Sequence, residues 1–316
     1  MARLLARLER QAADLWREHP PRIHHAKKRV IFERAGGVER IPRGSLVVSQ
    51  WAPSEEATVG AMVSVESVAG PFRYEALRDR FVWHVNFADT YLFAFYGGPA
   101  FAQDEIQVAE HPILASVRGW LDSGAVTIPA LTRTTNGPAP ILVRNVERWC
   151  AIDTNPQLAR PFGIYGRQLS RASDEAVAQG VMRLDEGPLS NVIAMVAPQG
   201  MGRYSSDQIR DILDTAVTSF VAAKEESGAA RVRIHTGHWG TGAFGGDRVL
   251  MAAAQIVAAR CAGVDELVYH SLDEAAVQAF ENGRAVAETI AIGASIEEVV
   301  ALLEAREFYW GRSDGN

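Results

Sequence analysis

The residues best suited to acid–base chemistry are two adjacent carboxylic acids, Asp104 and Glu105, within "AQDEI" at 102–106. Acids at the start of a predicted helix are stabilised by the positive end of its dipole, which is one sufficient explanation for them. The functional alternative is a carboxyl group that protonates a leaving oxygen and then activates water, while its neighbour orients a sugar. The pair alone does not decide between these interpretations.

A second stretch, "HTGHWGTGAFGGD" at 235–247, is rich in glycine yet contains Trp239 and Phe244. A strand, glycines and then a helix is a geometry in which backbone N–H groups can hold a phosphate. The stretch is not a Walker loop, because no Gly-Lys-Ser or Gly-Lys-Thr occurs in it, and it fits GxGxxG only in letters. Each aromatic ring is either a core residue or a wall against an adenine or ribose face.

The elements that would position these residues alternate along the chain, which predicts an α/β fold. Apolar and β-branched runs predict strands, and 3.6-residue periodicity predicts helices. Strands are expected at 46–49, 81–88, 141–153, 191–200, 231–237 and 266–271, and helices at 1–19, 103–112, 205–227, 247–263 and 295–308, with 54–79 unassigned. Ligands of such sheets bind at loops beyond the strand ends, which selects 93–103 and 235–247.

Bulk composition excludes several classes of protein. The 316 residues are 47% hydrophobic and carry a net charge of −6 without a long basic run, so direct nucleic-acid binding is not expected. No apolar run is long enough for a membrane span, and the charged, leucine-containing start is unlike a signal peptide, which indicates a cytoplasmic protein. Neither the two cysteines nor the histidines have the spacing of a metal site, so no metal is expected.

The two motifs together resemble those of a known family. "TGHWGTGAFGGD" is similar to the glycine loop of the poly(ADP-ribose) glycohydrolases, with His238 in place of asparagine, and "HVNFADTYLFAFYGGPAFAQDEI" resembles their strand and catalytic loop. The resemblance covers roughly 80–310 and implies a macrodomain, in which a mixed sheet lies between helices and ADP-ribose binds at the strand ends. We therefore expect an N-terminal helical or accessory segment at 1–75 and a macrodomain at 76–316.

The resemblance also implies roles for individual residues. Glu105 would be the catalytic acid, Asp104 would hold ribose hydroxyls, and Gln103 would support the pair. The loop around the diphosphate and distal ribose would consist of Gly240, Thr241, Gly242, Ala243, Phe244 and Gly245. No cofactor is implied.

The second motif departs from the family pattern. Counting back from Gln103, the three family glycines fall on Phe93, Ala94 and Phe95, so Phe95 is expected beside the substrate. Gly97 and Gly98 lie closer to the acids and could form the turn with a different spacing. Asp89 stands where the family has a ribose-contacting asparagine, and a carboxylate there would repel a diphosphate unless it is paired or protonated.

Three functions remain open from the sequence. The first is an ADP-ribosyl glycohydrolase with altered substrate scope, acting on ADP-ribose or poly(ADP-ribose) carried by modified proteins. The second is an ADP-ribose-binding reader without turnover, which the lost glycines favour. The third is a ligand-free interaction protein, which the intact 236–247 loop disfavours because glycines cost conformational entropy.

Overall fold

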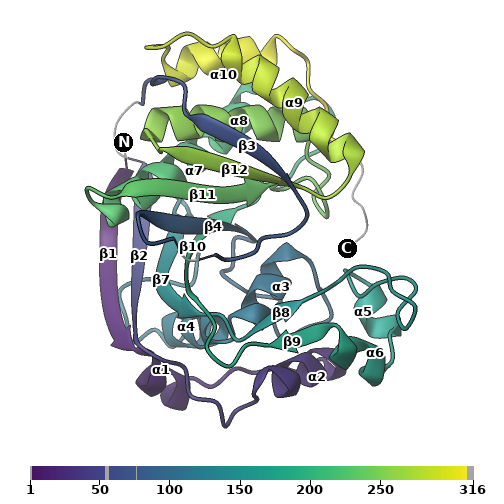
Figure 1. Ribbon diagram of the computed structural model, residues 1–316. Helices are drawn as coiled ribbons and strands as arrows, with labels where there is room; N and C mark the ends of the chain where they lie inside the picture. The colour runs from purple at the N-terminus through teal and green to yellow at the C-terminus, as the bar shows by residue number, and fades with distance from the viewer. Residues whose placement is uncertain (1, 54–56, 76, 312–316) are drawn as a thin grey trace.

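A mixed eight-stranded β-sheet forms the centre of the protein (Figure 1), in a computed structural model that describes residues 2–53, 57–75 and 77–311. The strand order is β1 (Ala2–Gln11), β2 (Ser45–Pro53), β7 (Ile141–Glu147), β10 (Leu189–Val196), β4 (Arg80–Ala88), β11 (Arg231–Gly237), β12 (Glu266–Ser271) and β3 (Ser64–Ala69). The five strands from β10 to β3 are parallel, and β1, β2 and β7 join them in antiparallel pairs.

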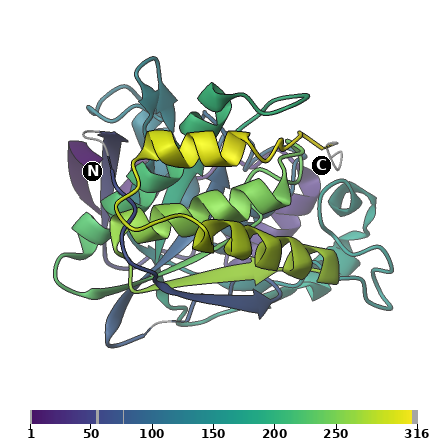
Figure 2. The same ribbon diagram turned by 90° about the horizontal axis from the view of Figure 1, so that it is seen from above.

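Helices cover both faces of this sheet, which gives three layers. One face carries α7 (Ser206–Ser227), α8 (Arg248–Ala262), α9 (Glu274–Glu288) and α10 (Ile296–Glu304), the last three of which lie in front of the sheet in Figure 2. The other face carries α1 (Ala12–Glu18), α2 (Ala26–Ala35), α3 (Gln103–Glu110) and α4 (Ile113–Asp122). Strand β10 supplies alternate residues to both cores, which explains its continuous apolar sequence.

Smaller elements lie beside these layers. Strands β8 (Cys150–Ile152) and β9 (Val181–Arg183) pair with each other, and α5 (Gln168–Arg171) and α6 (Asp174–Gln179) lie near them in Figure 1. A second short pair is β5 (Arg133–Thr134) with β6 (Gly137–Pro138). In the described part of the chain, no helix has the length and apolar character needed to cross a membrane.

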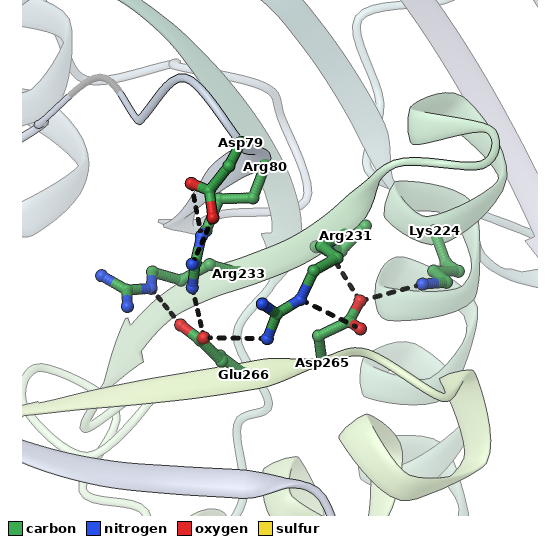
Figure 3. A network of polar contacts seen from close by, with 8 residues as sticks. Asp79, Arg80, Lys224, Arg231, Arg233, Asp265 and Glu266 are labelled. Atoms are coloured by element: carbon green, nitrogen blue, oxygen red, sulfur yellow. Dashed lines mark hydrogen bonds and ion pairs between the residues drawn. The ribbon is translucent and has the colours of Figure 1, made fainter.

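The amino-terminal ends of the parallel strands are tied together by charge (Figure 3). Arg80 of β4 and Arg233 of β11 both bind Glu266 of β12, and Lys224 binds Asp265 with Nζ and Oδ2 3.1 Å apart. Exposed pairs of this kind contribute little individually, although a network adds to strand pairing. The network marks the edge of the sheet opposite to the loops that follow β4 and β11.

The predicted α/β class and the strands at 81–88, 191–200, 231–237 and 266–271 are confirmed. The helix predicted at 1–19 is wrong over most of its length, because Ala2–Gln11 form an edge strand antiparallel to β2 and only Ala12–Glu18 are helical. The run 141–153 forms two strands in different sheets, and the unassigned region 54–79 contains β3. Because β1, β2 and β3 belong to the central sheet, strands precede the predicted boundary at residue 75, which itself stays a prediction.

Candidate active site at the carboxyl ends of the parallel strands

The two candidate motifs lie at the same edge of the sheet because β4 and β11 are parallel neighbours. The chain leaves β4 toward α3 on one face, whereas it leaves β11 toward α8 on the other face. Such a change of face between adjacent strands is where open α/β sheets bind their ligands. The loops 89–102 and 238–247 are therefore the expected ligand-binding loops of this fold.

Gln103 fastens the start of α3 to the end of β4. The pairing of β4 with β11 ends at His84 and His235, so the next backbone groups of β4 on that side need other partners. The Gln103 side chain provides them: its Nε2 donates to the Val85 carbonyl at 3.0 Å, and its Oε1 accepts from the Phe87 N–H at 2.8 Å. This arrangement fixes the first turn of α3 against the sheet.

That first turn carries the two acids, both almost fully buried, with Asp104 6% and Glu105 5% exposed. Asp104 Oδ1 accepts a hydrogen bond from Asn86 Nδ2 at 3.0 Å, and Glu105 Oε2 accepts one from the Ala102 N–H at 2.7 Å. Asn86 was not predicted from the sequence. Its signal was a polar side chain inside the otherwise apolar end of β4.

The electrostatics of the pair favour the retention of a proton. Burial, followed by the charge of Glu105, raises the pKa of Asp104 well above its ordinary value, while the Asn86 hydrogen bond and Lys28 oppose the rise. Nearby Asp89 raises it further. Asp104 is therefore able to carry a proton at neutral pH. A carboxyl pair of this kind can act as a general acid.

The loop after β4 is filled by aromatic side chains where the resemblance places glycines. Phe93 is fully buried in the core, yet its φ of +50° is a conformation that favours glycine. Phe95 is half-exposed, and Asp89 Oδ1 accepts from the Tyr91 N–H at 3.1 Å. The two phenylalanines thus differ in role: Phe93 is a core residue, and Phe95 is the one that lies at the surface.

The two glycines that follow also differ. A Cβ on Gly97 would lie 2.3 Å from the Arg22 carbonyl oxygen, so this glycine is required by a neighbouring backbone segment. A Cβ on Gly98 would meet nothing closer than the Phe95 carbonyl oxygen at 3.6 Å. Substrate binding by either glycine stays a prediction, and the structure supplies a separate packing reason for Gly97.

The second loop closes on itself through its glycines. Gly240 and Gly245 have φ of +70° and +65°, and the Gly246 N–H donates to the Gly240 carbonyl at 2.9 Å. A Cβ on Gly240 would lie 2.9 Å from Cδ of Pro198 in the loop after β10. Trp239 is fully buried and therefore is a core residue. The outer turn of the loop consists of half-buried or exposed residues, namely Thr241, Gly242, Ala243 and Phe244.

Tyr204 supports this loop from beneath. Its hydroxyl accepts a hydrogen bond from the Asp247 N–H at 2.9 Å, and its ring stacks on Trp310 at 4.3 Å between centroids. Asp247 in turn caps α8 by accepting from Val249 and Leu250. Tyr204 is buried, and its hydroxyl is occupied in holding the glycine loop. Within the described residues, no group of three His, Cys, Asp or Glu side chains could hold a metal.

Part of the chain matches a known protein family. Residues 167–279, which include the glycine loop but not Asp104 and Glu105, match the family model described as "Poly (ADP-ribose) glycohydrolase (PARG), Macro domain fold". The match therefore assigns a macrodomain fold to residues 167–279, and the sheet of the described residues is a mixed one. The resemblance to the poly(ADP-ribose) glycohydrolase family that the sequence predicts is confirmed.

Several solved structures are similar to this chain. Poly(ADP-ribose) glycohydrolase from Thermomonospora curvata is 17% identical over 81% of this chain and 88% of that chain, with a TM-score of 0.48. The Deinococcus radiodurans enzyme in complex with ADP-ribose is 11% identical over 89% of this chain and 95% of that chain, with a TM-score of 0.42. No curated protein matches the chain.

Proposed function

We propose that this protein is an ADP-ribosyl O-glycohydrolase that releases ADP-ribose from its conjugates. The observation that carries the proposal is the buried Asp104–Glu105 pair in the first turn of α3, at the sheet edge that also presents the glycine loop. Glycoside cleavage needs a carboxyl group that can hold a proton beside a site for a sugar. The raised pKa of Asp104, caused first by burial, supports proton storage in this pair.

In the proposed reaction, Glu105 protonates the 2′-oxygen as the bond from that oxygen to the anomeric carbon of the next ribose breaks. The resulting carboxylate then takes a proton from water, whose oxygen bonds to the anomeric carbon, so the carboxyl group returns to its starting state. Asp104, held by Asn86, accepts hydrogen bonds from ribose hydroxyls. Glu105 Oε2 is held by the Ala102 N–H, which leaves Oε1 as the atom that exchanges protons.

The glycine loop would bind the diphosphate. The backbone amides of Gly242, Ala243 and Phe244 belong to its outer turn, where they can face an anion without any net positive charge. Phe244 is half-buried and would pack against the distal ribose. The positive φ angles of Gly240 and Gly245 allow the backbone to come this close to a ligand.

The altered loop after β4 supports a changed substrate scope. Phe93 fills the core and Phe95 lies at the surface, where the family pattern has glycines. The surface side chain of Phe95 would reduce the space beside the diphosphate, so the enzyme would accept fewer extensions of the ADP-ribose unit than a glycine loop would. The same filling favours the alternative function, an ADP-ribose reader that binds without turnover.

Calorimetric titration with ADP-ribose, with AMP and ADP as controls, tests binding first. We expect ADP-ribose to bind more tightly than ADP and AMP because only it carries the distal ribose. A release assay on poly(ADP-ribose) and on mono-ADP-ribosylated protein then separates the two functions. Binding with release supports the enzyme, binding without release supports the reader, and no binding at millimolar ADP-ribose contradicts both.

A further inference from the structure

A segment far from the site in sequence lies directly on the loop after β4. This N-terminal strap, residues 22–28, donates its Arg22 N–H to the Tyr96 hydroxyl at 2.7 Å. The amides of His24 and His25 both donate to the Gly97 carbonyl, at 3.0 and 2.9 Å. Together with the close approach of Arg22 to Gly97, these contacts fix one side of the loop.

Lys28 is the only buried residue of the strap. It is only 3% exposed, and its Nζ donates to the carbonyls of Phe95 at 3.0 Å and Tyr96 at 2.9 Å. The same nitrogen lies 5.7 Å from the centroid of the Phe101 ring. A lysine is rarely buried unless its charge is compensated, so its retention here needs an explanation beyond packing.

The compensation comes from the candidate catalytic acids. Burial lowers the pKa of Lys28 to about 8, and the charges of Glu105 and then Asp104 oppose this change. Lys28 in turn lowers the pKa of Asp104. Lys28 of α2 and the two acids of α3 therefore interact electrostatically.

We infer that Lys28 is a positioning residue of this site, which fixes loop 93–97 through two carbonyl groups and provides the positive charge that faces Asp104 and Glu105. This inference rests on the proposed function. Lys28 touches the loop and not the reacting atoms, so it acts through the loop's position and through the protonation of the acids. Lys28 alone among the side chains of the strap then supports the active site through these contacts.

The other charges around Lys28 define how a pH profile should respond. Asp104 and Glu105 face it from α3, while His25 and Lys27 lie on its own segment. The loop after β4 contributes the titratable groups Asp89, Tyr91 and Tyr96. Removal of the Lys28 charge removes a group that lowers the pKa of Asp104, so the pKa of Asp104 should rise and the alkaline limb of the activity profile should move to higher pH.

The test compares Lys28→Met with Lys27→Met. Lys27 is the adjacent lysine, and its Nζ pairs instead with Asp174 Oδ1 of α6 at 2.6 Å. In Lys28→Met we expect faster amide hydrogen exchange in loop 93–97, a fall in kcat for ADP-ribose release of about 10- to 100-fold, and an upward shift of the alkaline limb. Lys27→Met should match the wild type in all three measurements.

Lys28→Arg provides the conservative control. A small cavity beside Lys28 is lined in part by Ile31, Tyr96 and Pro112. This variant keeps the charge, so we expect it to restore the wild-type pH profile, and it serves the same purpose if Lys28→Met fails to fold. A pH profile in Lys28→Arg that matches Lys28→Met would overturn the assigned electrostatic role.

The remaining outcomes separate this inference from the proposed function. If Lys28→Met and Lys27→Met show the same loop exchange and the same pH profile, the inference is wrong and the proposed function stands. If the wild type neither binds nor releases ADP-ribose, the proposed function is wrong. Exchange in loop 93–97 then still decides whether Lys28 positions that loop.

Discussion

His84 should make the protein sensitive to acid. Its ring is fully enclosed on β4 and stacks on His235 at 4.8 Å and on Tyr74 at 4.4 Å between centroids. Neither ring nitrogen has a hydrogen-bond partner among the residues that the structure describes. Burial is the largest cause that holds the pKa of His84 well below 6.5, and electrostatic repulsion from His235, His111, His270 and Arg148 lowers it further.

The sign and size of the effect follow from proton counting. His84 stays neutral in the folded protein, whereas the unfolded chain takes up a proton as the pH falls through 6.5. Its contribution to stability is therefore present above pH 6.5 and is lost as the pH falls toward the folded pKa. Between about pH 7.5 and 5.5, one such histidine lowers the free energy of unfolding by about 1.4 kcal/mol.

His84→Phe removes this titration and keeps an aromatic ring in the stack. Urea denaturation at several pH values between 7.5 and 5.5 should show a loss of stability that is about 1.4 kcal/mol smaller in the variant than in the wild type. His24→Gln changes an exposed histidine and serves as the control with wild-type pH dependence. Equal pH dependence in His84→Phe and the wild type would refute the argument that this ring is neutral when folded.

Two further comparisons test the loops by urea denaturation. Gly240→Ala should destabilise the protein by more than Gly263→Ala, because both glycines have positive φ but only Gly240 would place its new Cβ against Pro198; equal losses would mean that the Pro198 contact does not matter. Phe93→Ala should cost about 3–5 kcal/mol because the ring is fully buried, whereas Phe95→Ala at the surface should stay within about 0.5 kcal/mol. A large loss in Phe95→Ala would show that this ring packs in the core.

Local patterns in the sequence were sufficient for the central strands and the two loops at their ends. A buried strand such as 81–88 needs apolar residues on both faces, and this requirement is visible in the letters. The edge strand Ala2–Gln11 was misread because its leucines have helical spacing, with Leu4 and Leu5 exposed in the structure. Pairing with β2 decides its conformation, and this pairing depends on tertiary structure rather than on local propensity.

The supporting residues of the candidate site could not be predicted in the same way. Lys28 contacts carbonyl groups that lie 67 and 68 residues further along the chain, and nothing in its own neighbourhood indicates this contact. Asn86 contacts Asp104 only because α3 folds back over the end of β4. The role of Tyr204 in holding the glycine loop depends on its stacking against Trp310, which lies more than 100 residues further along the chain.

The most direct test of the proposed reaction is the release of ADP-ribose by Glu105→Gln compared with the wild type. Glutamine keeps the shape of the side chain but cannot carry a proton through the cycle, and Glu186→Gln changes an exposed glutamate as the control. We predict that Glu105→Gln releases ADP-ribose about 10²- to 10⁴-fold more slowly than the wild type. Its affinity for ADP-ribose should stay within about tenfold, roughly 1.4 kcal/mol. Release by Glu105→Gln at the wild-type rate would contradict the assignment of Glu105 as the acid.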